Sequence, residues 1–329
     1  MNNFAEKLEK WMPIRVAWHQ TAPLIDWCYV GEERFTDSFF DQTIENLFQK
    51  PFNLLLRPLT TIDVLQECYK IRPGLKPSGF IFHLSRCGST LVSQMLATLP
   101  KNVVISEASS LDWIIRAKVR KPDITDEEQI EWIRWMVAAL GQKRSPEAEH
   151  FFIKFDSWHT FELDLLKHAF PDVPWIFLYR NPLEVMVSHS KMRGAGTVRG
   201  SIDYQIPGLS FPDSLKISQD EYIARFLAKV CEYALQNREN PNGLFVNYTQ
   251  LPSILTTDIL KHFNIEYTDA EIEKINSAAR FDAKSPKVEF KTDVQTKQRE
   301  ASDEIREISN KILIPLYEEL EKVRYNSKR

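Results

Sequence analysis

The sequence has 329 residues, of which 43% are hydrophobic and 26% are charged. This composition fits a folded globular protein and excludes a disordered chain, a collagen-like chain and a disulfide scaffold. The 45 acidic and 42 basic residues leave a net charge of −3, which argues against a protein that covers a nucleic-acid backbone but leaves room for a small basic pocket. No apolar run approaches the ~18 residues that cross a bilayer, and the N-terminal segment lacks the pattern of a secretory signal. We therefore expect a cytoplasmic protein with neither nucleic-acid nor membrane partners.

The four cysteines do not form a metal-binding or disulfide pattern. They are scattered along the chain without a Cys-x-x-Cys pair, at Cys28, Cys68, Cys87 and Cys231. This spacing is typical neither of a zinc site nor of a disulfide framework. We expect free thiols, as in a reducing cytoplasm, and no bound metal.

The first 75 residues are predicted to form a helical extension. Helix-like segments run over Phe4–Trp11, Ser38–Gln49 and Ile62–Tyr69, and no parallel strand stands out among them. The junction at 71–77 contains two prolines and one glycine, which break helices and strands. We expect residues 1–75 to cap or flank a main domain that spans residues 76–329.

Strands and helices alternate through the main domain. The apolar runs are short and rich in aromatic and β-branched residues, as in strands that are covered on both faces of a parallel sheet. They lie at Phe80–Leu84, Val103–Ile105, Phe151–Phe155, Trp175–Tyr179 and Leu244–Tyr248. Helical patterns lie at Leu91–Leu99, Asp126–Leu140, Phe161–Phe170, Leu183–Met192 and Glu221–Arg238, and a helical stripe interrupted at Pro315 covers Ser302–Val323. This order predicts an α/β protein with a central, mostly parallel sheet between two helical layers.

A predicted phosphate loop follows the first of these strands. The strand runs directly into a turn of small residues, and a helix begins at once. The backbone amides of such a turn can wrap a phosphate, and the helix N-terminus adds partial positive charge. This arrangement is typical of a three-layer P-loop fold, but the Walker A lysine is missing and an arginine supplies the charge. An ordinary strand–turn–helix junction is the alternative. The loop consists of Ser85, Arg86, Cys87, Gly88, Ser89 and Thr90.

A second pair of phosphate-binding side chains is predicted at the end of the fourth strand. Arg180 stands at the carboxyl end of that strand, where ligands bind in open α/β sheets. Pro182 is placed to begin a helix, and Ser188 follows about two turns later. Arg180 and Ser188 can therefore hold one phosphate together. Taken singly, each residue is better explained as a surface arginine or an ordinary helix serine.

Together these segments resemble the sulfotransferases that use 3′-phosphoadenosine 5′-phosphosulfate (PAPS). That family has a [PS]-[KR]-[SC]-G-[ST]-[TS] loop, matched here by 85–90, and an R-[DN]-P segment with a serine eight residues after its arginine, matched by Arg180 and Ser188. The tyrosylprotein sulfotransferases and related bacterial enzymes also have a glutamate 21 residues after the loop arginine and a lysine 26 residues before the second arginine. These positions are Glu107 and Lys154. The resemblance covers 78–190 well and 222–248 loosely.

The resemblance implies a role for each of these residues. Arg86 and the loop amides would hold the 5′-phosphosulfate, whereas Arg180 and Ser188 would hold the 3′-phosphate. Lys154 would neutralise the leaving oxygen, because charge develops there during transfer. Glu107 would take the proton of the acceptor as a general base, for which a helix-capping or solvated glutamate is the alternative.

Five further residues are candidates on weaker grounds. Asp156 stands where cytosolic sulfotransferases have a histidine, so it is the rival base, with His159 behind it. Tyr248 belongs to a Tyr-x-x-L segment that in the family follows a strand, and it would contact the nucleotide. Lys284 and Ser285 lie in a basic loop of the kind that closes over the nucleotide phosphates in the family.

The implied activity is sulfuryl transfer from PAPS, which leaves 3′-phosphoadenosine 5′-phosphate (PAP), to a hydroxyl or, less favoured, an amine. No motif identifies the acceptor, and we expect a small metabolite. The irregular segment Arg193–Ser218 is predicted to be a lid or to be disordered. Two other functions stay open: an ATP-dependent phosphotransferase acting on a small molecule, against which the missing loop lysine argues, and a non-catalytic nucleotide-binding protein. The sequence leaves the oligomeric state open.

Overall fold

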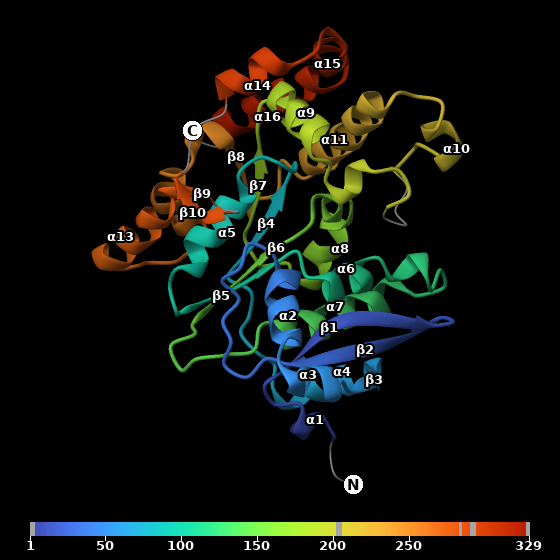
Figure 1. The fold of residues 1–329 in the computed structure, drawn as a ribbon, viewed down its shortest axis with the longest axis vertical. Coiled ribbons are helices and arrows are strands. Elements are labelled where there is room, and N and C mark those ends of the chain that lie inside the picture. The colour runs from blue at the N-terminus through green and yellow to red at the C-terminus, as the bar shows by residue number, and fades with distance from the viewer. Residues whose placement is uncertain (1–3, 202–205, 283–284, 290–293, 327–329) are drawn as a thin grey trace.

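A five-stranded sheet forms the centre of the molecule (Figure 1), with its strands parallel and in the order β5-β6-β4-β7-β8. The computed structural model describes residues 4–201, 206–282, 285–289 and 294–326. All five strands lie where the apolar runs predict them. Every residue of β4, β5 and β7 is buried, which explains why these runs lack polar alternation. The strands are β4 (Gly79–His83), β5 (Asn102–Ser106), β6 (His150–Lys154), β7 (Trp175–Tyr179) and β8 (Gly243–Asn247).

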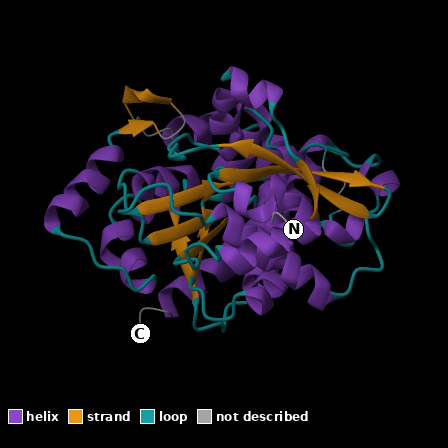
Figure 2. Ribbon diagram, turned by 90° about the horizontal axis from the view of Figure 1, so that it is seen from below, coloured by secondary structure: helices purple, strands orange, loops and turns teal. Residues whose placement is uncertain are grey.

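Helices cover both faces of this sheet (Figures 1 and 2), which confirms the predicted three-layer α/β architecture. Side-chain caps fix where the long helices begin: Thr125 accepts the Glu128 N–H at 3.1 Å, and Ser218 accepts the Glu221 N–H at 3.1 Å.

Among the described residues, none of the helices combines the length and apolar character needed to cross a membrane. The helices of these layers are α5 (Ser89–Ala97), α6 (Ser109–Ile115), α7 (Asp126–Leu140), α8 (Leu163–Ala169), α9 (Pro182–Lys191), α11 (Gln219–Gln236), α12 (Leu260–His262) and α13 (Asp269–Ala278).

The N-terminal extension contains a three-stranded antiparallel sheet that a purely helical prediction misses. The hairpin of β1 and β2 turns at Gln20 and Thr21, and Gln20 takes a positive φ of 56°. Glycine or asparagine usually occupies such a position, so the sequence carries no turn signal there. The predicted helix over Phe4–Trp11 correspondingly ends at Lys7. The elements of the extension are α1 (Phe4–Lys7), β1 (Trp11–His19), β2 (Ala22–Tyr29), α2 (Phe40–Phe48), α3 (Pro51–Leu55), β3 (Leu59–Thr61) and α4 (Ile62–Ile71).

The extension packs on the helices of the main domain. Strand β1 contacts α6 and α7, and α4 contacts α7, so the two parts share one interface. In Figure 1 the blue hairpin lies beside α6 and α7, below the central sheet. The division at residue 75 stays a prediction.

The C-terminal helices pass through the predicted interruption at Pro315 without ending. A wide, π-type turn over Ser309–Leu313 precedes the proline. Such a turn accommodates a residue that cannot donate an N–H. The segments are α14 (Val294–Glu300), α15 (Asp303–Ile308) and α16 (Ile314–Asn326), and the short strands β9 (Phe281–Asp282) and β10 (Ser285–Glu289) precede them.

The predicted lid over Arg193–Ser218 falls partly outside the described residues, which omit 202–205. Its described part holds a short turn at Ala195–Thr197 and the helix α10 (Phe211–Ser214). Whether the segment opens and closes stays a prediction.

The strand order creates one crevice at the carboxyl ends of the sheet. The chain leaves the central strand β4 toward β5 and β6, and after β6 it crosses to β7 on the other side of β4. In open α/β sheets, ligands bind where the order of strands reverses in this way. The loop after β4 and the ends of β6 and β7 therefore surround the expected ligand site.

Replacing Gly74 with alanine tests the junction between the extension and the main domain. Gly74 has a φ of +68°, and a Cβ atom there would lie 2.4 Å from the carbonyl oxygen of Ala138 in α7. Because neither this backbone conformation nor that carbonyl accommodates a side chain, we expect Gly74→Ala to lower the free energy of unfolding by about 2–4 kcal/mol in urea denaturation.

Gly208→Ala is the matched control. Gly208 has a φ of +82°, but among the described residues no atom lies within 4 Å of the added Cβ. This variant should cost only about 1 kcal/mol. Equal losses for the two variants would contradict close packing of the junction against α7.

Candidate active site

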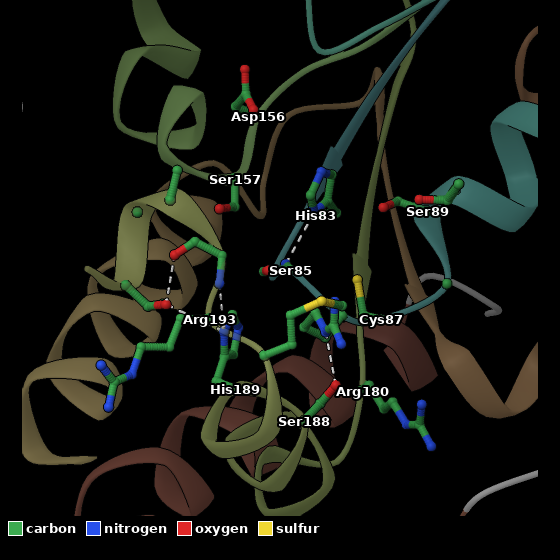
Figure 3. Close-up of a pocket in the computed structure, with 18 of the residues that line it drawn as sticks. His83, Ser85, Cys87, Ser89, Asp156, Ser157, Arg180, Ser188, His189 and Arg193 are labelled. Carbon is green, nitrogen blue, oxygen red and sulfur yellow. Dashed lines mark hydrogen bonds between the residues drawn. The ribbon is translucent and has the colours of Figure 1, made fainter. Parts of the chain in front are cut away.

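A cavity of about 500 Å³ opens at the carboxyl ends of β4 and β7, beside the end of β6 (Figure 3). Most of the site residues predicted from the sequence line it, although they come from segments more than 150 residues apart. Lys154 lies just beneath the wall and contacts it through Glu107. The predicted residues that line the cavity are Ser85, Arg86, Cys87, Gly88, Ser89, Thr90, Glu107, Arg180, Ser188 and Tyr248, together with the rival base Asp156.

The loop after β4 has an unusual backbone. Ser85 and Arg86 have φ angles of 74° and 55°, and Gly88 follows at 91°. A Cβ atom on Gly88 would lie 2.7 Å from Leu251 and 2.9 Å from the ring of Tyr248, so only glycine fits. Positive φ at non-glycine residues costs about 1–3 kcal/mol each and is found mainly where function requires it. The loop thus leads into the N-terminus of α5, whose first residues line the cavity.

Arg86 and Ser188 meet across the floor of the cavity. The Nε of Arg86 donates to Ser188 Oγ at 2.7 Å, joining the loop after β4 to helix α9 (Figure 3). Arg86 is predicted to hold one phosphate and Ser188 the other. Their contact therefore brings groups of the two predicted phosphate sites side by side.

Arg180 is buried and firmly held. Its Nε donates to Glu184 Oε2 at 2.6 Å, one helical turn further along α9, and its guanidinium lies 4.0 Å from the ring centre of Tyr248. Glu184 in turn accepts a hydrogen bond of 3.2 Å from Gln298 of α14. Because Arg180 is only 4% exposed, these contacts fix the orientation of its guanidinium at the cavity wall.

Lys154 and Glu107 form the central ion pair of the site. Lys154 is fully buried at the end of β6, and its Nζ donates to Glu107 Oε1 at 2.7 Å and to Thr90 Oγ1 at 3.4 Å. Glu107 directly follows β5, where its N–H donates to the Lys154 carbonyl at 2.8 Å and its φ is +56°. The register of β5 and β6 therefore brings the Glu107 carboxylate and the Lys154 ammonium together.

His83, at the end of β4, also faces Glu107. Its Nδ1 accepts the Ser85 N–H at 3.0 Å, so the neutral ring carries its proton on Nε2, which lies 3.4 Å from Glu107 Oε1. Burial lowers the pKa of His83. We therefore describe it as a neutral donor aimed at the glutamate.

The pKa values of the two candidate bases are shifted in opposite directions. Burial alone would raise the pKa of Glu107, but the Lys154 ammonium and the His83 N–H hold it well below its usual range. Burial raises the pKa of Asp156 well above its usual range, and the nearby carboxylates of Glu107 and Asp112 add to the effect. Glu107 is therefore ionised at neutral pH and stabilised as the anion. Asp156 binds its proton more tightly than an ordinary aspartate does.

His159 is engaged at both ring nitrogens. Its Nδ1 accepts the Asp156 N–H at 3.2 Å and its Nε2 lies 2.8 Å from Asp112 Oδ1. Asp112 also accepts from Trp158 Nε1 at 2.7 Å and from Arg116 Nε at 2.8 Å. Asp112, Asp156 and His159 could hold a metal by proximity, but Arg116 already neutralises Asp112. The network instead orients Trp158, which lines the cavity.

Phe39 and Lys297 are among the lining residues that no sequence motif predicts. Phe39, from the extension, lies with its ring centre 4.7 Å from Lys154 Nζ. Lys297, on α14, is 8% exposed and reaches the cavity because α14 packs against α9.

The predicted basic loop stays untested as a nucleotide contact. Lys284 lies outside the described residues, and only the backbone of Ser285, in β10, is described.

Comparison with known proteins identifies the family of the chain. A family model described as "Sulfotransferase family" matches residues 77–269, more than half of the chain. No curated protein matches in sequence. The sulfotransferase STF1 of Mycobacterium tuberculosis aligns with a TM-score of 0.42 and 15% identity over 65% of this chain and 75% of its own. STF9 of Mycobacterium avium gives 0.43 and 12% over 76% and 81%.

Retinol dehydratase, solved with androsterone and the inactive cofactor PAP, gives a TM-score of 0.33 and 13% identity over 99% of this chain and 94% of its own. These three similarities are distant, so the assignment rests on the sequence match. That match spans the loop after β4, both strand-end cations and helix α9. The chain belongs to the sulfotransferase family.

Proposed function

We propose that this protein is a PAPS-dependent sulfotransferase that moves a sulfuryl group to a hydroxyl, or less favourably an amine, of a small acceptor. The observation that carries the proposal is the convergence of three cations, Arg86, Lys154 and Arg180, around one cavity beside a carboxylate. Their spacing in the sequence is that of the PAPS-dependent enzymes. The loop has no lysine, which weighs against an ATP-dependent phosphotransferase.

The residues present fit a nucleotide with two separate phosphate groups. Arg86 and the N-terminus of α5 lie on one side of the cavity, and Arg180 lies at the end of the neighbouring strand. Lys297 adds a further cation to the wall. Gly88 lets Leu251 and Tyr248 pack closely against the loop. We propose that Arg86 and the loop amides hold the 5′-phosphosulfate and that Arg180, with Ser188, holds the 3′-phosphate.

Lys154 is placed to stabilise a leaving oxygen. An ammonium has three N–H donors. Two of them go to Glu107 and Thr90, and among the described residues no other hydrogen-bond acceptor takes the third. Bound PAPS would supply the activated sulfuryl group. Lys154 would then offer positive charge to the oxygen that gains negative charge in the transition state, in a site with little water.

Glu107 is proposed to accept the acceptor proton. Its pairing with Lys154 keeps it ionised, which a base requires, but also makes it a weak base. When Lys154 shares its charge with a leaving oxygen, the pKa of Glu107 rises and the carboxylate becomes more basic. His83 Nε2 lies 3.4 Å from Glu107 Oε1 and would face the carboxylate throughout. Asp156 remains the rival base.

The proposed acceptor is a small molecule with an apolar body. Aromatic side chains of Phe39, Trp158 and Phe226 line the cavity beside Glu107 and Asp156. Trp158 is held by its hydrogen bond to Asp112 and cannot turn freely. A rigid aromatic wall beside a carboxylate suits an acceptor that presents one hydroxyl from an apolar framework.

Thermal unfolding with added nucleotide tests the cofactor. We expect PAP at 100 times its dissociation constant to stabilise the protein by about 2.7 kcal/mol and to raise the melting temperature by several degrees. ATP with magnesium should have a much smaller effect at the same concentration. A shift with ATP and magnesium but none with PAP would contradict the proposal.

Glu107→Gln tests the base. We expect this variant to lose about 10²–10⁴-fold in kcat while it still binds PAP, because the amide keeps the size of the side chain but cannot take a proton. Asp156→Asn is the matched variant and should retain most of its kcat. The measurement is the rate of PAP release together with PAP affinity by calorimetry.

The pH profile of kcat/KM separates the two bases further. A base works only above its pKa, so with Glu107 as the base the value should stay flat down to about pH 5. With Asp156 as the base it should fall as the pH drops through the raised pKa of that residue. Retained turnover in Glu107→Gln, together with such a fall, would transfer the role to Asp156.

Arg180→Ala tests the 3′-phosphate. Losing a charge-assisted hydrogen bond costs about 1.5–3 kcal/mol, so we expect PAP to bind roughly 10–100-fold more weakly. Adenosine 5′-phosphosulfate, which has no 3′-phosphate, should lose little. Equal losses for the two nucleotides in equilibrium binding would refute this assignment.

A further inference from the structure

A second cavity lies away from the active site, between the extension and the main domain. Its volume is about 390 Å³. Residues near the start of β1, the end of β2 and the end of α4 form one side, and the C-terminal end of α7 forms the other. Among the residues that line it, none also lines the active-site cavity.

Arg144, just after α7, brings a buried cation to this cavity. Its side chain donates to the carbonyl oxygens of Gln142 at 2.9 Å and Leu140 at 3.2 Å, and to the sulfur of Met12 at 3.5 Å. The ring centre of Phe35 lies 5.0 Å from the guanidinium. All of these partners are uncharged. The buried Nε has no hydrogen-bond partner among the described residues.

The missing counter-ion sets Arg144 apart from three other buried cations among the described residues. Lys154 pairs with Glu107, Arg116 with Asp112 and Arg180 with Glu184. Arg144 is 8% exposed, and its hydrogen bonds within the described part of the chain all go to uncharged groups.

A buried charge without a partner is costly. Burial lowers the pKa of Arg144 to about 9, with no acidic neighbour opposing the shift. The side chain is therefore still charged at neutral pH. An anion bound in the cavity would supply the opposite charge that the protein itself does not.

Basic and apolar side chains make up most of the rest of the cavity lining. Arg72 and Lys143 line it together with Arg144, against the single carboxylate of Glu9. The fourth lining cation, Lys10, is paired with Glu32 at 3.1 Å. Apolar side chains make up most of the remaining surface. They are Leu8, Trp11, Trp27, Val30 and Cys68. A ligand that matches this lining has one anionic head and a small apolar or aromatic body.

We propose that this cavity is a binding site for a small organic oxyanion, with its carboxylate, sulfate or phosphate head on Arg144 and its apolar body against the tryptophans. The site is separate from the proposed sulfotransferase activity and does not depend on it. Because one wall belongs to the extension and the other to the main domain, the bound ligand would hold the two parts together.

Calorimetric titration with probes that share one aromatic ring tests the site. The probes are 4-nitrobenzoate, 4-nitrophenyl sulfate and 4-nitrophenyl phosphate, with uncharged 4-nitrobenzamide as the control ligand. We expect at least one of the three anions to bind and the amide to bind at least 10-fold more weakly. The tightest of the three identifies the preferred head group. Absence of binding by all three overturns the proposal.

Variants locate the binding. Arg144→Met, which keeps much of the side-chain volume, should weaken the anion at least 10-fold. Arg86→Met, which removes a cation from the other cavity, should leave that binding component unchanged. Lys143→Gln should weaken anion binding a few-fold, and the exposed control Lys216→Gln should leave anion binding unchanged. If Arg144→Met does not fold, Lys143→Gln and Trp11→Ala provide the test. Unchanged affinity in the cavity variants, or loss only in Arg86→Met, overturns the proposal.

Discussion

The structure of the active site depends on the ion pair between Lys154 and Glu107. Residues 106 and 154 are paired neighbours in the parallel register of β5 and β6, so Glu107 is the first residue beyond the sheet and stands over the lysine. A one-residue slip of either strand would turn its side chains to the other face of the sheet and separate the pair. The positive φ of Glu107 then turns its carboxylate back over the strand ends. A fully buried ammonium is tolerable there because the carboxylate neutralises it.

The same principle of paired, buried charge extends across the carboxyl edge of the sheet. Arg180 is held by Glu184 and Tyr248, and the network of Asp112 fixes Trp158. Each cation is thus oriented by groups of its own chain, which lowers the cost of ordering when an anion binds. The net charge of the whole chain is slightly negative, so it does not reveal this local concentration of cations. Arg144 differs from Lys154, Arg116 and Arg180 because no carboxylate among the described residues pairs with it, and it lies at another cavity.

Much of this arrangement can be predicted from the sequence, because it rests on local signals. Apolar runs mark all five strands, and the spacing of Arg86, Glu107, Lys154 and Arg180 places them at strand ends that the parallel fold must bring together. The hairpin of the extension could not be predicted, because its turn has no glycine or asparagine. Phe39 and Lys297 could not be predicted either, because they reach the cavity only through the packing of helices that are distant in sequence.

The proposed reaction of these residues is the transfer of a sulfuryl group from PAPS. The most direct measurement incubates the protein with PAPS labelled in its sulfuryl group and a panel of small hydroxyl and amine compounds, and follows labelled product and PAP together. We expect label on at least one hydroxyl compound, with an equal amount of PAP released. No transfer from PAPS to any compound, together with transfer of the γ-phosphate from labelled ATP to one of them, would contradict it.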